Sequence, residues 1–181
     1  MGWDFWHVDS WNGKIDRKKE MDKQYTWEND AAKVCVVKSV MKGSTYYAAI
    51  EHLEKSSGER TVHGVVGLTR IDAKDYCNFG CKTMGESMEP FYYDCPKSIL
   101  DLLTETDNEN ALNWRAKCRE NADKPTIGKL AIGTIIEFNA FGRTYRAEKM
   151  SPNHQFKTAW WLCDNGKYMP KKYIPRDFVI C

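Results

Sequence analysis

Apolar and polar residues alternate near the start of the chain with the period of a β-strand. Along residues 3–8 (WDFWHV) the alternation places Trp3 and Phe5 on one face and Trp6 and Val8 on the other. Because each face carries aromatic or aliphatic side chains, we expect a strand that is covered on both sides.

A helix is predicted after a tight turn at Asn12-Gly13. Asp16 can serve as its N-cap, and the helix is expected to run to about Trp27. Met21 and Tyr25 lie four residues apart and give it a narrow apolar stripe. The charged run DRKKEMDK is therefore expected to form the solvated face of this helix, over the indoles of the first segment.

Three segments rich in β-branched and aromatic residues follow, at 33–42, 45–55 and 60–72, and each has the composition of a strand. The sequence SSGE at 56–59 is typical of a hairpin turn. These segments predict an antiparallel sheet with the first helix packed on one side. Residues 73–93 are expected to be irregular, an aromatic loop held against the body of the protein.

Two further helices are predicted before a change in composition. Pro96 suits the first turn of a helix through Leu103, and the capping box at 106–109 predicts another helix that ends near Ala122. The second helix is expected to bury Ala111, Trp114, Cys118 and Ala122. The break at Asp123-Lys124-Pro125 predicts a domain boundary, with an α+β domain over 1–124 and a second domain over 125–181.

The second domain reads as short strands joined by tight turns. Asp164-Asn165-Gly166 is a strong hairpin signal, and a one-turn helix is expected around Tyr173. Five short strands in so few residues predict a small SH3-like β-barrel. The expected strands are 133–138, 143–150, 158–163, 167–169 and 178–181.

Charge is distributed unevenly between these two parts. The chain has 27 basic and 25 acidic residues, a net charge of +2. Residues 1–123 hold 17 basic and 21 acidic residues (−4), and residues 124–181 hold 10 and 4 (+6). The basic end is therefore the part expected to meet a polyanion.

Cysteine usage and hydropathy bear on location. Seven cysteines without paired spacing favour a reducing compartment. Cys77 and Cys81 lack the spacing of a zinc site, so we expect no metal. No apolar run is long enough for a membrane span, and Asp4 and His7 interrupt the segment where a signal peptide would be apolar. We expect a cytoplasmic protein.

Basic and aromatic residues are interleaved in the second domain, a mixture suited to phosphates and bases. Trp160 and Trp161 are neighbours in a strand, so one of them can be core while the other is displayed. A solvated basic face without a ligand is the alternative. The candidate nucleic-acid or partner-binding residues are Arg143, Arg146, Lys149, Lys157, Trp160, Lys167, Lys171, Lys172 and Arg176.

Catalysis has little support in the sequence. Asp72-Ala73-Lys74 has the Asp-x-Lys form that Mg²⁺-dependent nucleases use, but so short a pattern arises easily by chance. The four histidines fall in no motif, and no phosphate-binding glycine loop or nucleophile elbow is present. We expect no catalytic residue and no cofactor.

Three stretches carry a resemblance to a known family. MGWDFWH, NGKIDRKKEMDKQYTW and NFGCKTMGESMEPFYYDCPKSILDLL, with FK-x-x-WW at 156–161, resemble a family of small proteins from phages, mobile elements and gut bacteria. That family includes type II-A anti-CRISPR inhibitors of Cas9. The resemblance implies stoichiometric inhibition of Cas9, with or without guide RNA, by blocking target DNA engagement or cleavage.

Physical handles for such an inhibitor can be named. Cas9 holds nucleic acid in positively charged channels, to which carboxylates of an inhibitor could bind. The acidic candidates are Asp94, Asp101, Glu105, Asp107 and Glu109. The basic domain could instead hold double-stranded DNA. A DNA- or RNA-binding module of a mobile element and, less favoured, a Mg²⁺-dependent nuclease are the alternatives, and whether the chain forms a homodimer is open.

Overall fold

The chain divides into two compact units, Met1–Asp123 and Lys124–Cys181, next to the boundary that the sequence predicts. The computed structural model describes residues 3–8, 15–71, 78–175 and 177–181. Each unit is described below by itself. Within the described residues, no helix has the length and apolar character that crossing a membrane requires.

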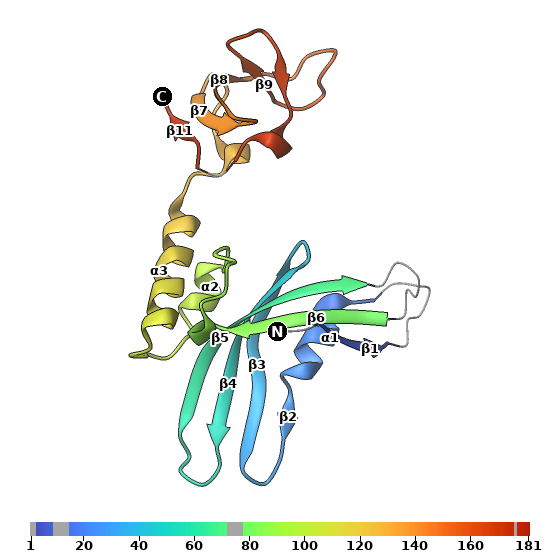
Figure 1. Cartoon of the computed structure of the whole chain (residues 1–181), viewed down its shortest axis with the longest axis vertical. Coiled ribbons are helices and arrows are strands. Elements are labelled where there is room, and N and C mark those ends of the chain that lie inside the picture. The colour runs from blue at the N-terminus through green and yellow to red at the C-terminus, as the bar shows by residue number, and fades with distance from the viewer. Residues whose placement is uncertain (1–2, 9–14, 72–77, 176) are drawn as a thin grey trace. The chain divides into compact units, whose positions relative to one another are not determined.

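The described part of the N-terminal unit is built on a curled antiparallel sheet that forms half a barrel (Figure 1), which confirms the predicted α+β class. Its six strands lie in the order β1-β6-β5-β4-β3-β2. The strands predicted at 33–42, 45–55 and 60–72 are present, and their ends lie within one residue of the predicted ones. Residue 72 itself lies outside the described residues. The strands are β1 (Asp4–His7), β2 (Trp27–Glu28), β3 (Ala32–Lys42), β4 (Thr45–Glu54), β5 (Arg60–Ile71) and β6 (Asn78–Gly85).

The two faces of this sheet bury separate apolar cores, because successive side chains of a strand point to opposite faces. Tyr46 belongs to the core under helix α1 (Arg17–Gln24), where Met21 is completely buried. Its neighbour Tyr47 belongs to the other core, under α2 (Lys97–Leu100) and α3 (Glu109–Asp123). Each such large apolar side chain contributes about 1.5–3 kcal/mol through its burial.

Helix α1 starts as predicted and ends early. The Asp16 carboxylate accepts a hydrogen bond from the Lys19 amide at 3.1 Å, as an N-cap does. The helix stops at Gln24, and Trp27 lies in strand β2, so the predicted end was wrong. Glu20 is buried, although the whole charged run was expected to be solvated. The predicted turn at residues 12–13 lies outside the described residues.

Strand β1 is covered on one face only. Trp6 packs edge-on against Phe79, with ring centroids 4.9 Å apart. On the other face Phe5 remains 39% exposed and lies over Gly80, where a Cβ atom would meet its ring at 2.5 Å. The expectation that both faces are covered was therefore wrong, because no helix of the described residues lies over this end of the sheet's second face.

Residues 78–85 form strand β6, where an irregular loop was expected. The segment NFGCKTMG has two glycines and a lysine, so its own composition does not indicate a strand. Hydrogen bonds to the two neighbouring strands hold these residues in the extended conformation. β6 hydrogen-bonds to β5 on one side, with Leu68 opposite Lys82, and to β1 on the other, with Phe5 opposite Gly80.

The two later helices differ from prediction at their ends. Pro96 caps α2, which is only one turn long and stops at Leu100 rather than Leu103. In α3 the side chain of Asn108, not Thr106, accepts the hydrogen bond from the Ala111 amide. Three of the four predicted inner residues of α3 are buried, and Ala122 is exposed, so its prediction was wrong.

The C-terminal unit, as far as it is described, holds a five-stranded antiparallel sheet in the order β10-β9-β8-β7-β11. The predicted hairpin at residues 164–166 joins β9 and β10, with Gly166 at φ +75°, and a 3-10 turn at Lys171–Tyr173 precedes the last strand. Ile136, Phe138 and Trp161 form the centre of its core. The strands are β7 (Ile135–Ala140), β8 (Arg143–Met150), β9 (Trp160–Cys163), β10 (Tyr168–Met169) and β11 (Val179–Ile180).

Candidate nucleic-acid interface

Three aromatic rings are stacked on the outer surface of the C-terminal unit. In β9 Trp161 is buried and Trp160 turns outward, the division that the strand period predicts. The Phe156 ring lies between the other two, with centroids 4.8 Å from Trp160 and 4.8 Å from Tyr168. Tyr168 is 47% exposed. The rings therefore form a preformed platform that offers π-faces to a ligand.

Local hydrogen bonds hold this platform in place. The Asn153 side-chain oxygen accepts hydrogen bonds from the backbone amides of Gln155 and Phe156. The backbone amide of Asn153 donates to the Phe156 carbonyl at 2.8 Å. The Trp160 indole nitrogen donates to the Ser151 carbonyl at 2.9 Å. The loop before β9 is thus closed on itself, so the rings need little reorganisation to bind.

Two lysines are direct chain neighbours of rings in the platform. Lys157 follows Phe156 and Lys167 precedes Tyr168 in the chain, and both lysines are exposed. Within residues 125–175 and 177–181 no carboxylate forms an ion pair with a basic group, so this positive charge is not neutralised internally.

A second aromatic and basic pair lies at another turn of the same unit. Lys172 places its amine 4.8 Å from the centroid of the Tyr173 ring, which meets Phe141 edge-on at 5.3 Å. Phe141 is 68% exposed and has φ +51°, a left-handed conformation that is costly for a bulky residue. Phe141 and Gly142, at φ +51° and +71°, are the two residues of the hairpin turn between β7 and β8, and such a turn requires a positive φ at both positions.

The remaining predicted basic residues are placed differently from one another. Arg143, Arg146 and Lys171 are exposed. Lys149 is buried instead, because its amine donates to the carbonyls of Gly128 at 3.0 Å and Leu130 at 2.5 Å. Lys149 therefore anchors residues 128–130, near the start of the unit. The sequence predicted an exposed lysine at this position, and that prediction was wrong. Arg176 lies outside the described residues.

The predicted acidic residues lie around the start of α3 but do not form one open patch. Glu105, Asp107 and Glu109 are exposed. Asp101 forms an ion pair with Arg119 at 3.9 Å, and Asp94 is half-buried, with its carbonyl accepting from Lys42. The negative charge available to a cationic partner is thus smaller than the sequence suggests.

The described residues include the side-chain types that bind metals or act as nucleophiles. No three of their His, Cys, Asp or Glu side chains converge as metal ligands. Burial raises the pKa of the Cys118 thiol to about 11 and also raises that of Cys95, which makes both poor nucleophiles. Burial lowers the pKa of His63, against the opposing charge of Glu86. Residues 72–74 and Cys77 lie outside the described residues.

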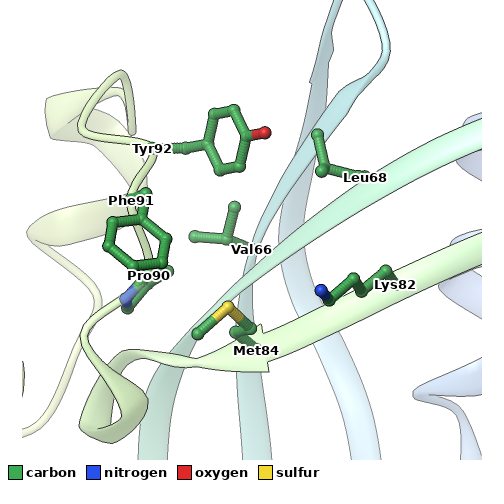
Figure 2. Close-up of a pocket in the computed structure, with 7 residues that line it drawn as sticks. All are labelled: Val66, Leu68, Lys82, Met84, Pro90, Phe91 and Tyr92. Carbon is green, nitrogen blue, oxygen red and sulfur yellow. The ribbon is translucent and has the colours of Figure 1, made fainter. Parts of the chain in front are cut away.

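Sequence reasoning missed an apolar pocket of about 310 Å³ in the N-terminal unit (Figure 2). It lies between the second half of β5, the second half of β6 and the segment that follows the 3-10 turn at Glu86–Met88. Since residues 73–93 were expected to form a loop, the strand that supplies one wall could not be foreseen. The lining residues are Val66, Leu68, Lys82, Met84, Pro90, Phe91 and Tyr92.

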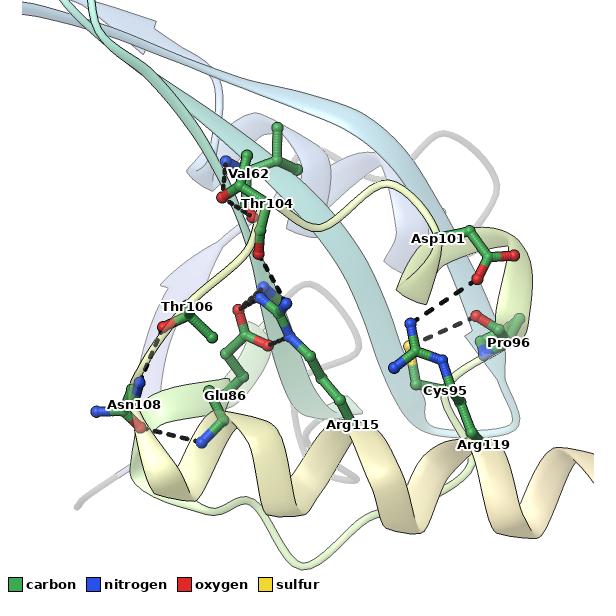
Figure 3. A network of polar contacts seen from close by, with 12 residues as sticks. Val62, Glu86, Cys95, Pro96, Asp101, Thr104, Thr106, Asn108, Arg115 and Arg119 are labelled. Atoms are coloured by element: carbon green, nitrogen blue, oxygen red, sulfur yellow. Dashed lines mark hydrogen bonds and ion pairs between the residues drawn. The ribbon is translucent and has the colours of Figure 1, made fainter.

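A buried ion pair fixes α3 against the same sheet (Figure 3). Arg115 donates from Nε and a terminal nitrogen to the two carboxylate oxygens of Glu86 at 2.6 and 2.8 Å. Glu86 also accepts from the Gly64 amide at 2.9 Å, and Arg115 donates to the Thr104 carbonyl at 2.7 Å. The pair is fully hydrogen-bonded, and no pattern in the sequence indicates it because its members are 29 residues apart.

Comparison with known protein families gives a match to only part of the chain. One family, described as a domain of unknown function (DUF6927), matches residues 105–141, which include α3 and β7. No curated protein matches. No solved structure matches.

Proposed function

We propose that this protein acts by stoichiometric binding to a nucleoprotein and that its C-terminal unit holds the nucleic-acid component. The observation that carries the proposal is the stacked platform of Phe156, Trp160 and Tyr168, flanked in the chain by exposed lysines without carboxylate partners. Aromatic faces stack on bases, and unpaired ammonium groups attract phosphates.

The proposal includes an SH3-like barrel for this unit. Its support is the order of the strands: β7 to β10 follow one another across the sheet, and β11 returns after a 3-10 turn to pair with β7. Small barrels of this kind serve far more often as binding scaffolds than as catalysts.

For the partner we propose type II Cas9 with its guide RNA, inhibited before target engagement or cleavage. The support is the resemblance of the MGWDFWH, GKIDRK and YYDCPKSIL segments to the family that includes Cas9 inhibitors. A protein of this kind would work in the bacterial cytoplasm. It could contact the effector through one surface and double-stranded DNA through another.

Nucleic-acid binding is tested with labelled single- and double-stranded oligonucleotides by fluorescence anisotropy over a range of salt concentrations. We expect binding that weakens steeply with salt and falls at least tenfold in Lys157→Glu/Lys167→Glu, since two positive charges are reversed and the net charge near the platform changes by four units. Lys19→Glu/Lys38→Glu, which changes two exposed lysines of the N-terminal unit, is the matched control. Equal loss in both variants, or no binding by the wild type, would refute the proposed surface.

Inhibition is tested separately in a Cas9 cleavage reaction, with the protein added before guide RNA, before target DNA or after both. We expect less cleavage when it precedes the target, at protein equimolar with Cas9. Unchanged cleavage at excess protein would remove Cas9 as the partner. Nucleic-acid binding that persists would then leave the module of a mobile element as the function.

A further inference from the structure

The apolar pocket of the N-terminal unit has a preformed wall. The Glu89 backbone is left-handed at φ +49°, and its carboxylate accepts from the Asn113 side chain at 2.7 Å. The Trp114 indole donates to the Tyr92 carbonyl at 3.1 Å, and the Asn121 side chain donates to that of Tyr93 at 3.2 Å. Helix α3 therefore fastens the segment on which Pro90, Phe91 and Tyr92 stand, so the pocket exists before a partner arrives.

Large apolar side chains are exposed to solvent at the rim of the pocket and next to it. Of the lining residues, Phe91 is 80% exposed and Tyr92 is 40% exposed, and Met88, which precedes the lining segment in the chain, is 49% exposed. All three belong to the segment that α3 holds in place. Exposed apolar side chains gathered around a concave site are characteristic of protein–protein contacts, in which aromatic residues and methionine are enriched.

The electrostatics of the pocket have one sign. Lys82 is the charged residue among its lining, and it forms no ion pair with any described residue. Figure 2 shows its amine directed along β6 toward Met84. Arg70 on β5 adds a second positive charge on the same face, held 4.4 Å from the Trp3 ring and 4.6 Å from the Phe5 ring.

We propose that this pocket binds an apolar side chain of a partner protein that carries a carboxylate beside it. The apolar side chain displaces water from between Val66, Met84 and Pro90, and the carboxylate meets the Lys82 amine at the edge. The volume, about 310 Å³, is at the lower end of ligand pockets and fits one large side chain rather than an extended ligand. The proposal concerns the N-terminal unit and does not depend on the nucleic-acid surface of the other unit.

The wall chemistry favours a protein over a nucleobase. Val66, Leu68 and Met84 offer no hydrogen-bond partner, and among the lining side chains only the Lys82 amine and the Tyr92 hydroxyl are polar. A buried base would leave most of its edge donors and acceptors unpaired, at a cost for each one. An aliphatic or aromatic side chain has no such groups.

The test uses the full chain with methyl-labelled methionine, valine and leucine, observed by NMR. Three blocked tetrapeptides serve as probes, each with a central Phe-Leu and with glutamate, glutamine or lysine at both ends. We expect the glutamate peptide to shift the Met84 and Val66 methyl signals and to bind about fivefold more tightly than the glutamine peptide, with the lysine peptide weakest. Lys82→Met should remove that preference, and Lys19→Met, an exposed lysine of α1, should keep it.

Several outcomes would overturn the proposal. One is that no peptide moves the Met84 signal, and another is that all three bind equally. A thymidine oligonucleotide that shifts these methyl groups more than the peptides do would assign the pocket to nucleic acid. Self-association in sedimentation, abolished by Phe91→Ser, would instead identify a second copy of the chain as the occupant. Because Phe91 is exposed, that variant is expected to fold.

Discussion

The two units of this chain use their charged residues in opposite ways. In the N-terminal unit basic groups meet carboxylates, as in the buried pair of Arg115 with Glu86 and the surface pair of Lys97 with Asp123. Within residues 125–175 and 177–181 no ion pair is formed, although residues 124–181 have a net charge of +6. Ion pairs therefore neutralise part of the charge of the first unit, whereas within residues 125–175 and 177–181 no carboxylate neutralises a basic side chain.

The sharpest test of this contrast removes the guanidinium of the buried pair. We expect Arg115→Leu to lower the free energy of unfolding by about 3–5 kcal/mol, because it leaves the Glu86 carboxylate buried without a counter-ion. Urea denaturation of the full chain measures the loss. Arg119→Leu, which breaks a surface pair of the same helix, is the control and should cost at most about 1 kcal/mol. Similar losses in both variants would contradict the assignment.

Lys149 is the exception that sharpens the comparison, as a lysine of the C-terminal unit with a structural role. We expect Lys149→Met to destabilise that unit by about 1–3 kcal/mol, because the carbonyls of Gly128 and Leu130 lose their donor. The exposed Lys157→Met should leave stability within about 0.5 kcal/mol of wild type. Nucleic-acid affinity lost by Lys149→Met without any loss of stability would refute this view.

Asp22 provides a test by pH in the N-terminal unit. Burial acts to raise its pKa, but hydrogen bonds from Lys18, Ser39 and Tyr46 outweigh burial and hold the pKa below the ordinary value of 3.8. A carboxyl with a lowered folded-state pKa contributes stability that is fully present above its unfolded-state pKa. That contribution is lost as the pH falls through the folded-state value.

Asp22→Asn should therefore cost about 1 kcal/mol at neutral pH and progressively less in acid. Denaturation midpoints of wild type and variant, measured from neutral pH downward, should converge as the pH drops below about 4. Asp30→Asn serves as the control, since that exposed carboxylate forms no hydrogen bond or ion pair with a described residue. A difference between wild type and Asp22→Asn that does not change with pH would count against the hydrogen-bonded carboxylate.

The smallest expected effect on stability belongs to the lysines next to the aromatic platform. Lys157→Gln/Lys167→Gln should change the free energy of unfolding by less than about 0.5 kcal/mol, because neither amine has a hydrogen-bond or ion-pair partner among the described residues. The same variant should reduce the slope of log affinity against log salt by about two. Loss of stability with an unchanged slope would reverse the roles given to charge in the two units.

Local patterns were sufficient for much of the architecture. The β-branched runs of β3 to β5 predicted these strands to within one residue, and the turn residues of the C-terminal unit predicted its strands to within two, because each signal lies within a few positions of the structure it specifies. β6 was missed for the opposite reason. Its glycines and lysine favour no strand, and only pairing with β1 and β5 makes it one.

Some features of the candidate site were also predictable from local patterns, and others were not. The alternation in β9 and the basic character of residues 124–181 indicated an exposed Trp160 with lysines near it. The stack with Phe156 and Tyr168 was not foreseeable, because it depends on how two loops close. The burial of Lys149 was also invisible, since a lysine in an alternating strand looks the same whether its amine meets water or two carbonyls.

By itself, the amino-acid sequence determined the two-part organisation, the strand and helix class of most segments and the opposite charges of the two parts, since these follow from the order of residue types along the chain. Tertiary structure alone decided which charges are neutralised, which rings stack and where a pocket opens. Those properties depend on groups far apart in sequence that meet only after the sheet has curled and α3 has packed on it.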